Sequence, residues 1–222
     1  REEQDAYALE SQRRAGAAIR EGRFKGEIVP VTVQGRKGES RAVTEDEHPR
    51  PETTLEDIKK LPPVFREGGT VHAGNSSGIT DGAASILLVA ESVARERGLK
   101  PQAWVAESAV VGVDPSIMGI GPVPATRELL GRTGRTLDAY ELIELNEAFA
   151  AQVIACDRDL KLDRVRLNVN GGAIALGHPI GATGARIVTT LVHEMERRGA
   201  SLGLATLCVS GGLGIALELS RN

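Results

Sequence analysis

Apolar residues recur at helical spacing in some segments of the chain. In other segments they form short runs that are rich in strand-favouring residues. Within residues 146–160, the apolar positions repeat at i, i+4, i+7 and i+11, which predicts a helix with one buried face. Residues 182–198 carry a second face of this kind and end before Gly199, a residue typical of helix C-termini. The helices predicted in this way cover 2–21, 54–60, 124–131, 146–160 and 182–198, and one more ends at Gly98.

Strands are predicted between these helices. The runs of strand-favouring residues lie at 28–33, 103–111, 140–145, 167–169, 202–209 and 213–219. The last two runs flank Ser210-Gly211-Gly212, which predicts an antiparallel hairpin. Helices and strands that alternate along a chain indicate an α/β fold with a layered α/β/α sheet.

Two segments break this alternation. Residues 34–70 are polar and contain four prolines, which predicts a long excursion from the core. A glycine-serine turn at 72–82 follows, and after it comes the apolar run 83–90. That run has no charged or polar position except one serine, so we expect a buried strand.

The composition limits the classes of protein that the chain can belong to. Its 222 residues suffice for one large domain, or for one domain and part of another, and 41% of them are hydrophobic. A net charge of −3 gives no sign of the basic surface that nucleic acids need. Two cysteines are too few for a disulfide framework, so a reducing compartment and a cytoplasmic location are expected. The uncharged run 202–217 is too short and too rich in glycine to span a membrane.

Two reactive side chains stand in glycine-rich settings near the C-terminus. His178 precedes the helix predicted to begin near Gly181, and the positive end of a helix favours a neutral imidazole. Such a ring can take a proton from a thiol or donate a hydrogen bond to an oxyanion. Cys208 ends a predicted strand just before a glycine turn, where catalytic side chains tend to emerge in α/β sheets. The pair suggests acyl-transfer or carbanion chemistry.

Simpler interpretations of the same residues stay open at this point. His178 could cap a turn, and Cys208 could be a small core residue. Asn146 suits the N-cap of the helix at 146–160, and the serines at 76–77 suit a plain turn. Cys156 lies on the apolar face of its helix and is predicted to be a core residue. No group of histidine, cysteine and acidic residues has the spacing of a metal site, so no metal is expected.

Five longer motifs together resemble the thiolases, specifically the acetyl-CoA C-acetyltransferase type. They are HAGNSSGITDGAASILLVA at 72–90, MGIGPVPATR at 118–127, NEAFAAQ at 146–152, NVNGGAIALGHPIGATGAR at 168–186 and GLATLCVSGGLG at 203–214. The resemblance begins at Arg1 and includes RFKGEIVP at 23–30, so it covers essentially the whole chain.

The resemblance implies a domain organisation. Residues 1–79 correspond to the end of the thiolase loop domain, on the side that binds coenzyme A. Residues 80–98 correspond to the last strand and helix of the N-terminal core domain, and residues 99–222 to the C-terminal thiolase domain. The sequence has no initiator Met, and its first twenty residues are predicted to be a helix already under way. Because the N-terminal half of the family also has no counterpart, we expect a truncated, processed or cleaved chain.

The resemblance also implies the roles of individual residues. In thiolases the asparagine of NEAF holds a water that forms an oxyanion hole with the histidine of GHPIG, and the cysteine of CxGGG exchanges the proton of the carbon nucleophile. These roles fall on Asn146, His178 and Cys208, with the backbone of Gly211 beside them. This chain has CVSGG where the family usually has CIGGG. The residues implied to contact coenzyme A are Ser77, Gly74, Ala73, Arg50, Phe65 and Phe149.

The implied reaction is acyl transfer between coenzyme A and acetyl-CoA, as acetoacetyl-CoA formation or as 3-ketoacyl-CoA thiolysis in fatty acid metabolism. Its substrates are coenzyme A thioesters, and no cofactor is expected. Neither Cys156 nor Cys208 matches the nucleophilic cysteine of the family, so the missing N-terminal half is an expected partner. The full-length protein is expected to be a homo-oligomer, a dimer or a tetramer, without nucleic acid or membrane. The alternatives are a non-catalytic CoA-binding or assembly subunit and a thiolase-like lipid carrier.

Overall fold

The centre of the fold is a four-stranded mixed sheet with the strand order β3-β6-β5-β4. The computed structural model describes residues 1–35 and 38–221. Strand β4 runs parallel to β5, and the other two pairs are antiparallel. The strands are β3 (Trp104–Gly112), β4 (Leu142–Leu145), β5 (Leu202–Val209) and β6 (Leu213–Ser220). The predicted hairpin of the last two strands is confirmed.

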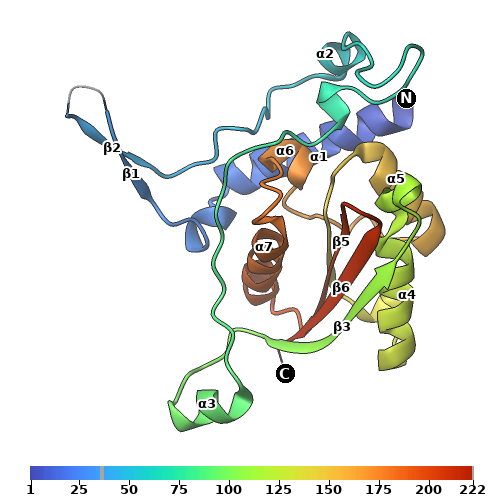
Figure 1. Cartoon of the computed structure of the whole chain (residues 1–222). Coiled ribbons are helices and arrows are strands. Elements are labelled where there is room, and N and C mark those ends of the chain that lie inside the picture. The colour runs from blue at the N-terminus through green and yellow to red at the C-terminus, as the bar shows by residue number, and fades with distance from the viewer. Residues whose placement is uncertain (36–37, 222) are drawn as a thin grey trace.

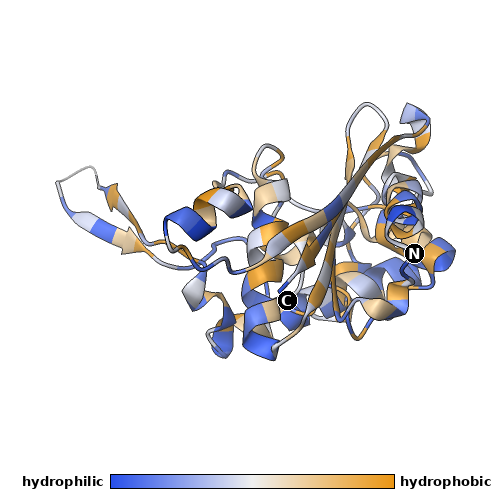
Figure 2. Cartoon of the chain, turned by 90° about the horizontal axis from the view of Figure 1, so that it is seen from below, coloured by the Kyte–Doolittle hydropathy of each residue, from blue (hydrophilic) through white to orange (hydrophobic). Residues whose placement is uncertain are grey.

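Helices cover both faces of this sheet (Figure 1). On one face, α4 (Pro122–Thr133) and α5 (Ala150–Leu160) enclose a core that contains Leu129, Val153 and Leu204. On the other face, α7 (Thr183–Arg198) buries the apolar stripe predicted from its periodicity, with Ile187, Leu191 and Met195 at the sheet. The layered α/β/α prediction is therefore confirmed. Figure 2 shows hydrophobic residues along the central strands and hydrophilic residues on the outer sides of the helices.

The N-terminal part of the chain packs on one end of this core. Helix α1 (Glu2–Arg20) contacts α5, the short α6 (Ala173–Leu176) and the turn η2 (Ala73–Asn75). The hairpin of β1 (Val31–Gln34) and β2 (Ser40–Val43) projects from the body as an arm (Figure 1). The remaining short helices are η1 (Arg23–Gly26), α2 (Leu55–Lys59), α3 (Glu91–Glu96), η3 (Pro115–Ile120) and η4 (Leu137–Ala139).

The turn between β5 and β6 requires glycine. Gly212 has a φ of +89°, and a Cβ on it would lie 2.3 Å from the carbonyl oxygen of Val113. A Cβ on Gly214 would lie 1.9 Å from the carbonyl oxygen of Gly121. Because these are contacts with backbone, a larger residue could not be accommodated by a rotamer change. The glycines of this motif thus let β6 approach the loop between β3 and α4 closely.

The apolar run 83–90 is not buried, and that prediction is wrong for this chain. The segment forms no strand and crosses open solvent as an extended stretch before α3 (Figure 1). Leu87 and Leu88 are 82% and 73% exposed. An apolar strand needs a neighbouring strand for its backbone hydrogen bonds, and none of the four strands of the central sheet lies beside it. Its assignment to an N-terminal core domain stays a prediction.

Two smaller predictions differ from the structure. The strand expected at 28–33 begins at Val31, because η1 occupies the chain up to Gly26. The strand expected at 167–169 is reduced to isolated bridges, one of which pairs Leu167 with Ile143. None of the helices in the described ranges is long and apolar enough to cross a membrane.

Candidate active site

Asn146 stands at the carboxyl end of β4 and does not cap a helix. Helix α5 begins four residues later, and its N-cap is Phe149. The backbone N–H of Asn146 donates to the carbonyl oxygen of Thr206 at 3.0 Å, which extends the parallel pairing of β4 with β5 by one residue. The N-cap interpretation is therefore wrong, because strand pairing already satisfies this backbone group. The side chain is 1% exposed, and no residue in the described ranges bonds to its Oδ1.

His178 meets Asn146 at this end of the sheet. Its Nε2 lies 3.4 Å from Nδ2 of Asn146, and its Nδ1 lies 2.6 Å from the hydroxyl of Thr183. The Thr183 hydroxyl donates its proton to the carbonyl oxygen of Pro179 at 2.9 Å, so it accepts from Nδ1 of the histidine. These bonds assign the tautomer with a protonated Nδ1 and leave a lone pair on Nε2. Burial and the charge of Arg186 lower the pKa of His178, which favours this neutral form.

The segment 76–79 joins the loops that carry these two residues. The backbone N–H and the hydroxyl of Ser77 both donate to the carbonyl oxygen of Ala148, at 3.1 and 3.0 Å. Two residues further, Ile79 pairs with His178 in a parallel bridge. The backbone N–H of His178 donates to the carbonyl oxygen of Gly78 at 2.8 Å. The glycine-serine turn thus lies between the asparagine loop and the histidine loop and is hydrogen-bonded to both.

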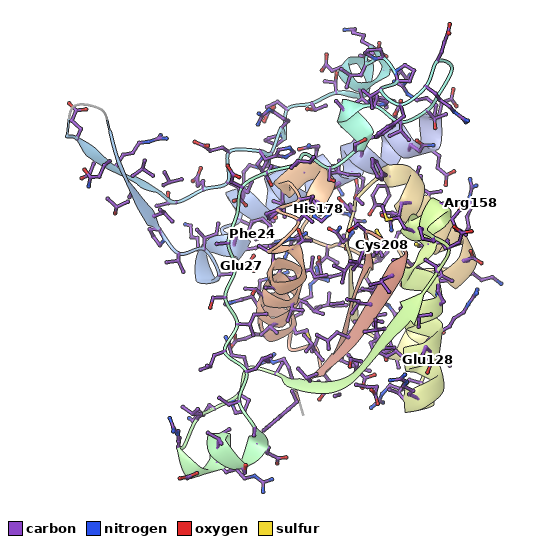
Figure 3. The ribbon with its side chains drawn as sticks, in the orientation of Figure 1. Phe24, Glu27, Glu128, Arg158, His178 and Cys208 are labelled. Atoms are coloured by element: carbon purple, nitrogen blue, oxygen red, sulfur yellow. The ribbon has the colours of Figure 1, made fainter. Side chains whose placement is uncertain are left out.

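Cys208 stands near the carboxyl end of β5, the strand that pairs with β4. Because β4 and β5 are parallel, Cys208 and Asn146 emerge at the same edge of the sheet. Figure 3 shows Cys208 and His178 at that end. Burial raises the pKa of Cys208, so its thiol is protonated at neutral pH. Gly211, in the turn that follows, has a φ of +87° and open space around its Cα.

Cys156 is fully buried on α5, as its place on the apolar stripe predicts. Burial raises its pKa to about 12. Its sulfur contacts the amide of Gln152 and the carbonyl oxygen of Gly119, at 3.6 and 3.5 Å. This thiol is therefore a core group.

The structure brings together some of the residues implied to contact coenzyme A. Phe65 packs edge to face on Phe149, with ring centroids 5.8 Å apart, although Phe65 is 71% exposed. Phe149 also pairs with Ser76 in a bridge, beside Ser77. Arg50 is exposed, and its guanidinium donates to three backbone carbonyl oxygens of residues 47–49. No contact in the described ranges joins Arg50 to the aromatic pair.

Ala73 and Gly74 lie in the turn η2, which a buried histidine holds in place. His72 is 0% exposed, and its Nδ1 accepts the backbone N–H of Gly74 at 3.1 Å. Its Nε2 donates to Asp5 of α1 at 2.7 Å. A Cβ on Gly74 would lie 2.7 Å from the Leu61 side chain. The turn that precedes Ser77 is thereby fixed to α1.

Sequence reasoning missed two residues of this site. Thr183 orients the catalytic candidate His178, but in the sequence it is only one hydroxyl residue at a helix start. The second residue is His48, which packs against the glycine-serine turn and the end of α6. Its Nδ1 contacts the carbonyl oxygen of Ala175 at 2.8 Å, and a Cβ on Gly78 would lie 2.2 Å from its Nε2. His48 lies in the polar excursion, where the sequence carries no periodic signal that could reveal it.

A buried group of charges lies beneath the histidine loop. Burial raises the pKa of Glu144 to about 8, although the guanidinium of Arg186 stands 3.8 Å from its carboxylate and opposes this shift. Burial likewise raises the pKa of Glu27 to about 7. The guanidinium nitrogens of Arg186 are buried and have no hydrogen-bond partner in the described ranges. In the folded chain at neutral pH, Glu144 is therefore largely protonated and Glu27 is about half protonated.

This arrangement predicts that the chain loses stability as the pH rises. The pKa values of Glu27 and Glu144 are higher in the folded chain than in the unfolded chain, where they are about 4.3. The contribution of these two carboxyls to the free energy of unfolding is complete below about pH 4.3 and is lost as the pH rises toward 8. Chemical denaturation is expected to show a fall in the free energy of unfolding on the order of 6 kcal/mol between pH 5 and pH 8, somewhat more than half of it from Glu144.

The substitution Glu144→Gln is expected to remove more than half of this pH dependence, because an amide does not titrate. Glu128→Gln serves as the matched control, since Glu128 is half exposed and pairs only with Arg132 within the described ranges. A parent chain whose stability rises over this interval, or a Glu144→Gln variant with the slope of the parent, would contradict the prediction.

Comparisons with known proteins place this geometry in a family. A family model described as the C-terminal domain of thiolase matches residues 99–221, and one described as the N-terminal domain of thiolase matches residues 1–92. The acetyl-CoA acetyltransferase of Pseudomonas aeruginosa is 56% identical over 222 residues, which are 100% of this chain and 56% of that protein. The beta-ketoadipyl-CoA thiolase of the same organism is 53% identical over 223 residues and is covered to 55%.

Solved structures agree with these matches. The acetyl-CoA acetyltransferase of Bacillus anthracis superposes with a TM-score of 0.96 at 49% identity, over 99% of this chain and 55% of that chain. Human mitochondrial 3-ketoacyl-CoA thiolase in complex with CoA superposes with a TM-score of 0.91 at 45% identity, over 100% of this chain and 55% of that chain. The chain therefore spans about half the length of the relatives that it matches.

Proposed function

The chain belongs to the thiolase family, and we propose that it supplies the acid-base and oxyanion-binding half of an acyl-transfer site for coenzyme A thioesters. The observation that carries the proposal is the meeting of His178 and Asn146 at the carboxyl ends of β4 and β5. Relatives are named acetyl-CoA acetyltransferase and beta-ketoadipyl-CoA thiolase. The reaction proposed is acetoacetyl-CoA formation or its reverse, 3-ketoacyl-CoA thiolysis.

His178 is proposed to act first as a base. The lone pair on Nε2 can take the proton of a nucleophilic cysteine that comes from the N-terminal half of the protein. The thiolate attacks the carbonyl carbon of an acyl-CoA, the carbon–sulfur bond to coenzyme A breaks, and the proton returns to the sulfur of the departing coenzyme A. Between these two proton transfers Nε2 is protonated, and the imidazolium can then donate a hydrogen bond to the thioester oxyanion.

Asn146 is proposed to complete the oxyanion-binding group. Its amide lies within 3.4 Å of Nε2 of His178, and it is buried, so a donor held there is shielded from bulk water. The partnerless Oδ1 can accept from a bridging water, which supports the role that thiolases give to this asparagine.

Cys208 is proposed to move the proton of the carbon nucleophile. In the synthetic direction the Cys208 thiol first gives its proton to Nε2 of His178, which is free again after the first acyl transfer. The Cys208 thiolate then takes a proton from the methyl group of acetyl-CoA, and the resulting carbanion attacks the acyl-enzyme. The carbon–carbon bond forms as the bond to the nucleophilic cysteine breaks, and the departing cysteine thiolate takes its proton from Nε2 of His178. The position near a strand end and beside the glycine turn supports this role, because the substrate can approach the main chain there.

The pantetheine arm of coenzyme A is proposed to pass the turn 73–77 and the aromatic pair of Phe65 and Phe149. The hydroxyl of Ser77 donates to Ala148 but keeps lone pairs that can accept an amide N–H. Arg50 is proposed to reach a phosphate of coenzyme A, because its side chain is exposed and positively charged. No cofactor or metal takes part in the reaction as proposed.

Activity is proposed for the chain together with an N-terminal half. We define the completed protein as the N-terminal half of the Pseudomonas aeruginosa acetyl-CoA acetyltransferase fused ahead of Arg1. At 56% identity over the shared part, the contacts between the two halves should be largely preserved. The completed protein is expected to be a homo-oligomer and to work in the cytoplasm.

Thiolysis of acetoacetyl-CoA by the completed protein tests the proposal. Asn146→Ala is expected to lower kcat about 100-fold, because the loss of one oxyanion-hole group commonly has an effect of this size. Asn170→Ala is the matched control, since buried Asn170 bonds to Arg23 and Glu194 and not to His178. The control is expected to lose stability but to keep kcat within about fivefold of the parent. A kcat within threefold of the parent for Asn146→Ala would refute the role of this residue.

A further inference from the structure

The carboxylate of Glu147, next to Asn146, is the centre of a buried hydrogen-bond network. Glu147 is 1% exposed. Its Oε1 accepts from the hydroxyl of Tyr7 at 2.8 Å and from Nδ2 of Asn168 at 3.0 Å. Its Oε2 accepts from the hydroxyl of Ser11 at 2.7 Å and from the backbone N–H of Ile174 at 3.1 Å. Each carboxylate oxygen therefore has two donors, and the negative charge is fully engaged.

The groups around this carboxylate are shaped to receive it. A Cβ on Gly172 would lie 2.3 Å from Cδ of Glu147, so any other residue there would displace the carboxylate. The φ of Gly172 is −140°, which other residues also adopt, so the space for Glu147 is what requires glycine. Burial and the carboxylate of Glu147 raise the pKa of Tyr7 well above its usual value. The phenol therefore remains a donor.

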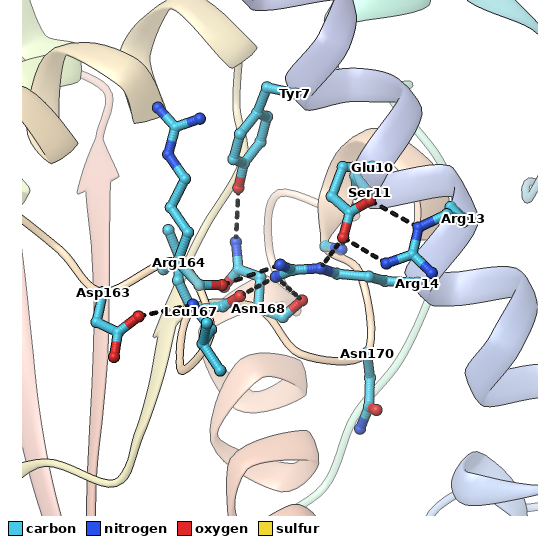
Figure 4. A network of polar contacts seen from close by, with 12 residues as sticks. Tyr7, Glu10, Ser11, Arg13, Arg14, Asp163, Arg164, Leu167, Asn168 and Asn170 are labelled. Atoms are coloured by element: carbon cyan, nitrogen blue, oxygen red, sulfur yellow. Dashed lines mark hydrogen bonds and ion pairs between the residues drawn. The ribbon is translucent and has the colours of Figure 1, made fainter.

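The four donors come from three separate parts of the chain. Tyr7 and Ser11 lie on α1, Asn168 follows the strand-like segment beside β4, and Ile174 lies in α6. Figure 4 shows Tyr7 pointing from α1 toward Asn168, to which it is also bonded. α6 ends directly before the loop of His178. One carboxylate therefore ties α1 to both loops of the candidate site.

Asn168 fastens the strand end from which Asn146 emerges. Its side chain bonds to both backbone groups of Leu145, accepting from N–H at 2.9 Å and donating to the carbonyl oxygen at 2.8 Å. Asn168 does this with a φ of +45°, in the left-handed region, where its short polar side chain is tolerated. The Nδ2 of Asn168 is shared between Leu145 and Glu147, so a change at Glu147 reaches the backbone beside Asn146.

We propose that Glu147 is a positioning residue for the reaction, whose carboxylate sets the separation between Asn146 and the loop of His178. The proposal rests on the function proposed above. Glu147 itself does not face the reacting atoms, since all its acceptor sites are used within the fold. It acts through the two loops, which its donors Asn168 and Ile174 hold on either side.

The test is Glu147→Gln in the completed protein. In either orientation the amide removes the acceptor at residue 147 for Asn168 or for Ile174, because an NH2 group replaces one of the two oxygens. Asn168 keeps its bond to Leu145. The hydroxyls of Tyr7 and Ser11 can rotate, but the backbone N–H cannot. We expect kcat for thiolysis to fall between about 10-fold and 100-fold, the effect of a displacement near 1 Å at a reacting group. The KM for coenzyme A should stay within about threefold, since the turn 73–77 is not bonded to this carboxylate.

Glu10→Gln is the matched control. Glu10 lies on the same helix α1 and bonds to Arg13 and Arg14 (Figure 4), and its side chain is 37% exposed. The kcat of the Glu10→Gln variant should match that of the parent protein. If Glu147→Gln does not fold, Ser11→Ala removes one donor and keeps the charge, and a smaller fall in kcat of about three- to tenfold is expected.

Crystal structures of the parent and of Glu147→Gln supply a readout that does not depend on turnover. The separation of Nδ2 of Asn146 from Nε2 of His178 is expected to change from 3.4 Å by more than about 0.5 Å. If the parent shows no turnover, the proposed function fails while this separation still decides the role of Glu147. A kcat within twofold of an active parent, or an unchanged separation, would overturn the positioning role.

Discussion

Residues 1–222 by themselves are expected to give no measurable thiolysis of acetoacetyl-CoA, whereas the completed protein is expected to be active. The chain contains two cysteines, and neither suits the role of acyl acceptor. Cys156 is buried among core side chains with its pKa raised to about 12. Cys208 is needed for the proton of the carbon nucleophile. Without a third thiol the covalent intermediate cannot form, and the two-step route is closed.

The exposed segment 83–90 gives the same expectation a structural basis. Its leucines face solvent, and its backbone has no strand partner in the described part of the chain. Each unsatisfied backbone group that becomes buried costs about 1–3 kcal/mol. The chain alone is therefore expected to associate in solution, and analytical ultracentrifugation should show species larger than a monomer. Fusion of the N-terminal half should supply the partner strand.

The control for this comparison is the composition of the sample. Thiolysis is followed at the absorbance of the magnesium enolate of acetoacetyl-CoA, and intact mass spectrometry checks that no longer species is present. Turnover by pure residues 1–222 would contradict the argument and would require an acyl acceptor other than the cysteine of the N-terminal half.

The sequence predicted the elements that bury an apolar stripe against the sheet. The helix at 182–198 is found at Thr183–Arg198, because Ile187, Leu191 and Met195 occupy one face. The helix at 146–160 was predicted to begin too early. Asn146 followed by Glu147 has the composition of a helix start, but the backbone N–H of Asn146 pairs with β5 and its neighbour's carboxylate lies in a buried network. A local pattern cannot reveal partners that lie 60 residues away, as Thr206 does from Asn146, or 136 residues away, as Ser11 does from Glu147.

The same limit explains the apolar run 83–90. The apolar composition of this run indicates that it is suited to burial. Composition does not indicate which part of the protein would cover the run. In this chain that part is absent from the described residues, and the segment is exposed. The candidate site shows the opposite case. The family motifs predicted His178 and Asn146, and the structure brings them within 3.4 Å of each other. The bond from His178 to Thr183 and the network around Glu147 are tertiary contacts, and the sequence did not predict them.

His178→Ala in the completed protein is expected to lower kcat for thiolysis at least about 1,000-fold. Loss of a general base of this kind removes between about 10² and 10⁴ in rate. The loss also removes a donor to the oxyanion, so the effect should lie in the upper part of that range. Cys208→Ala is expected to have a similar effect on thiolysis, because the proton of the carbon nucleophile then has no carrier. The two variants should differ in the step that they block.

The exchange of labelled coenzyme A into acetyl-CoA separates those steps and tests the central claim, that one site divides acid-base work between His178 and Cys208. The exchange needs acyl transfer to the nucleophilic cysteine and back, but it makes no carbon–carbon bond. His178→Ala is expected to lose exchange and thiolysis alike. Cys208→Ala is expected to lose about 1,000-fold in thiolysis and to keep exchange within about tenfold of the parent. Equal loss of both activities in Cys208→Ala, or thiolysis that survives it, would contradict the account.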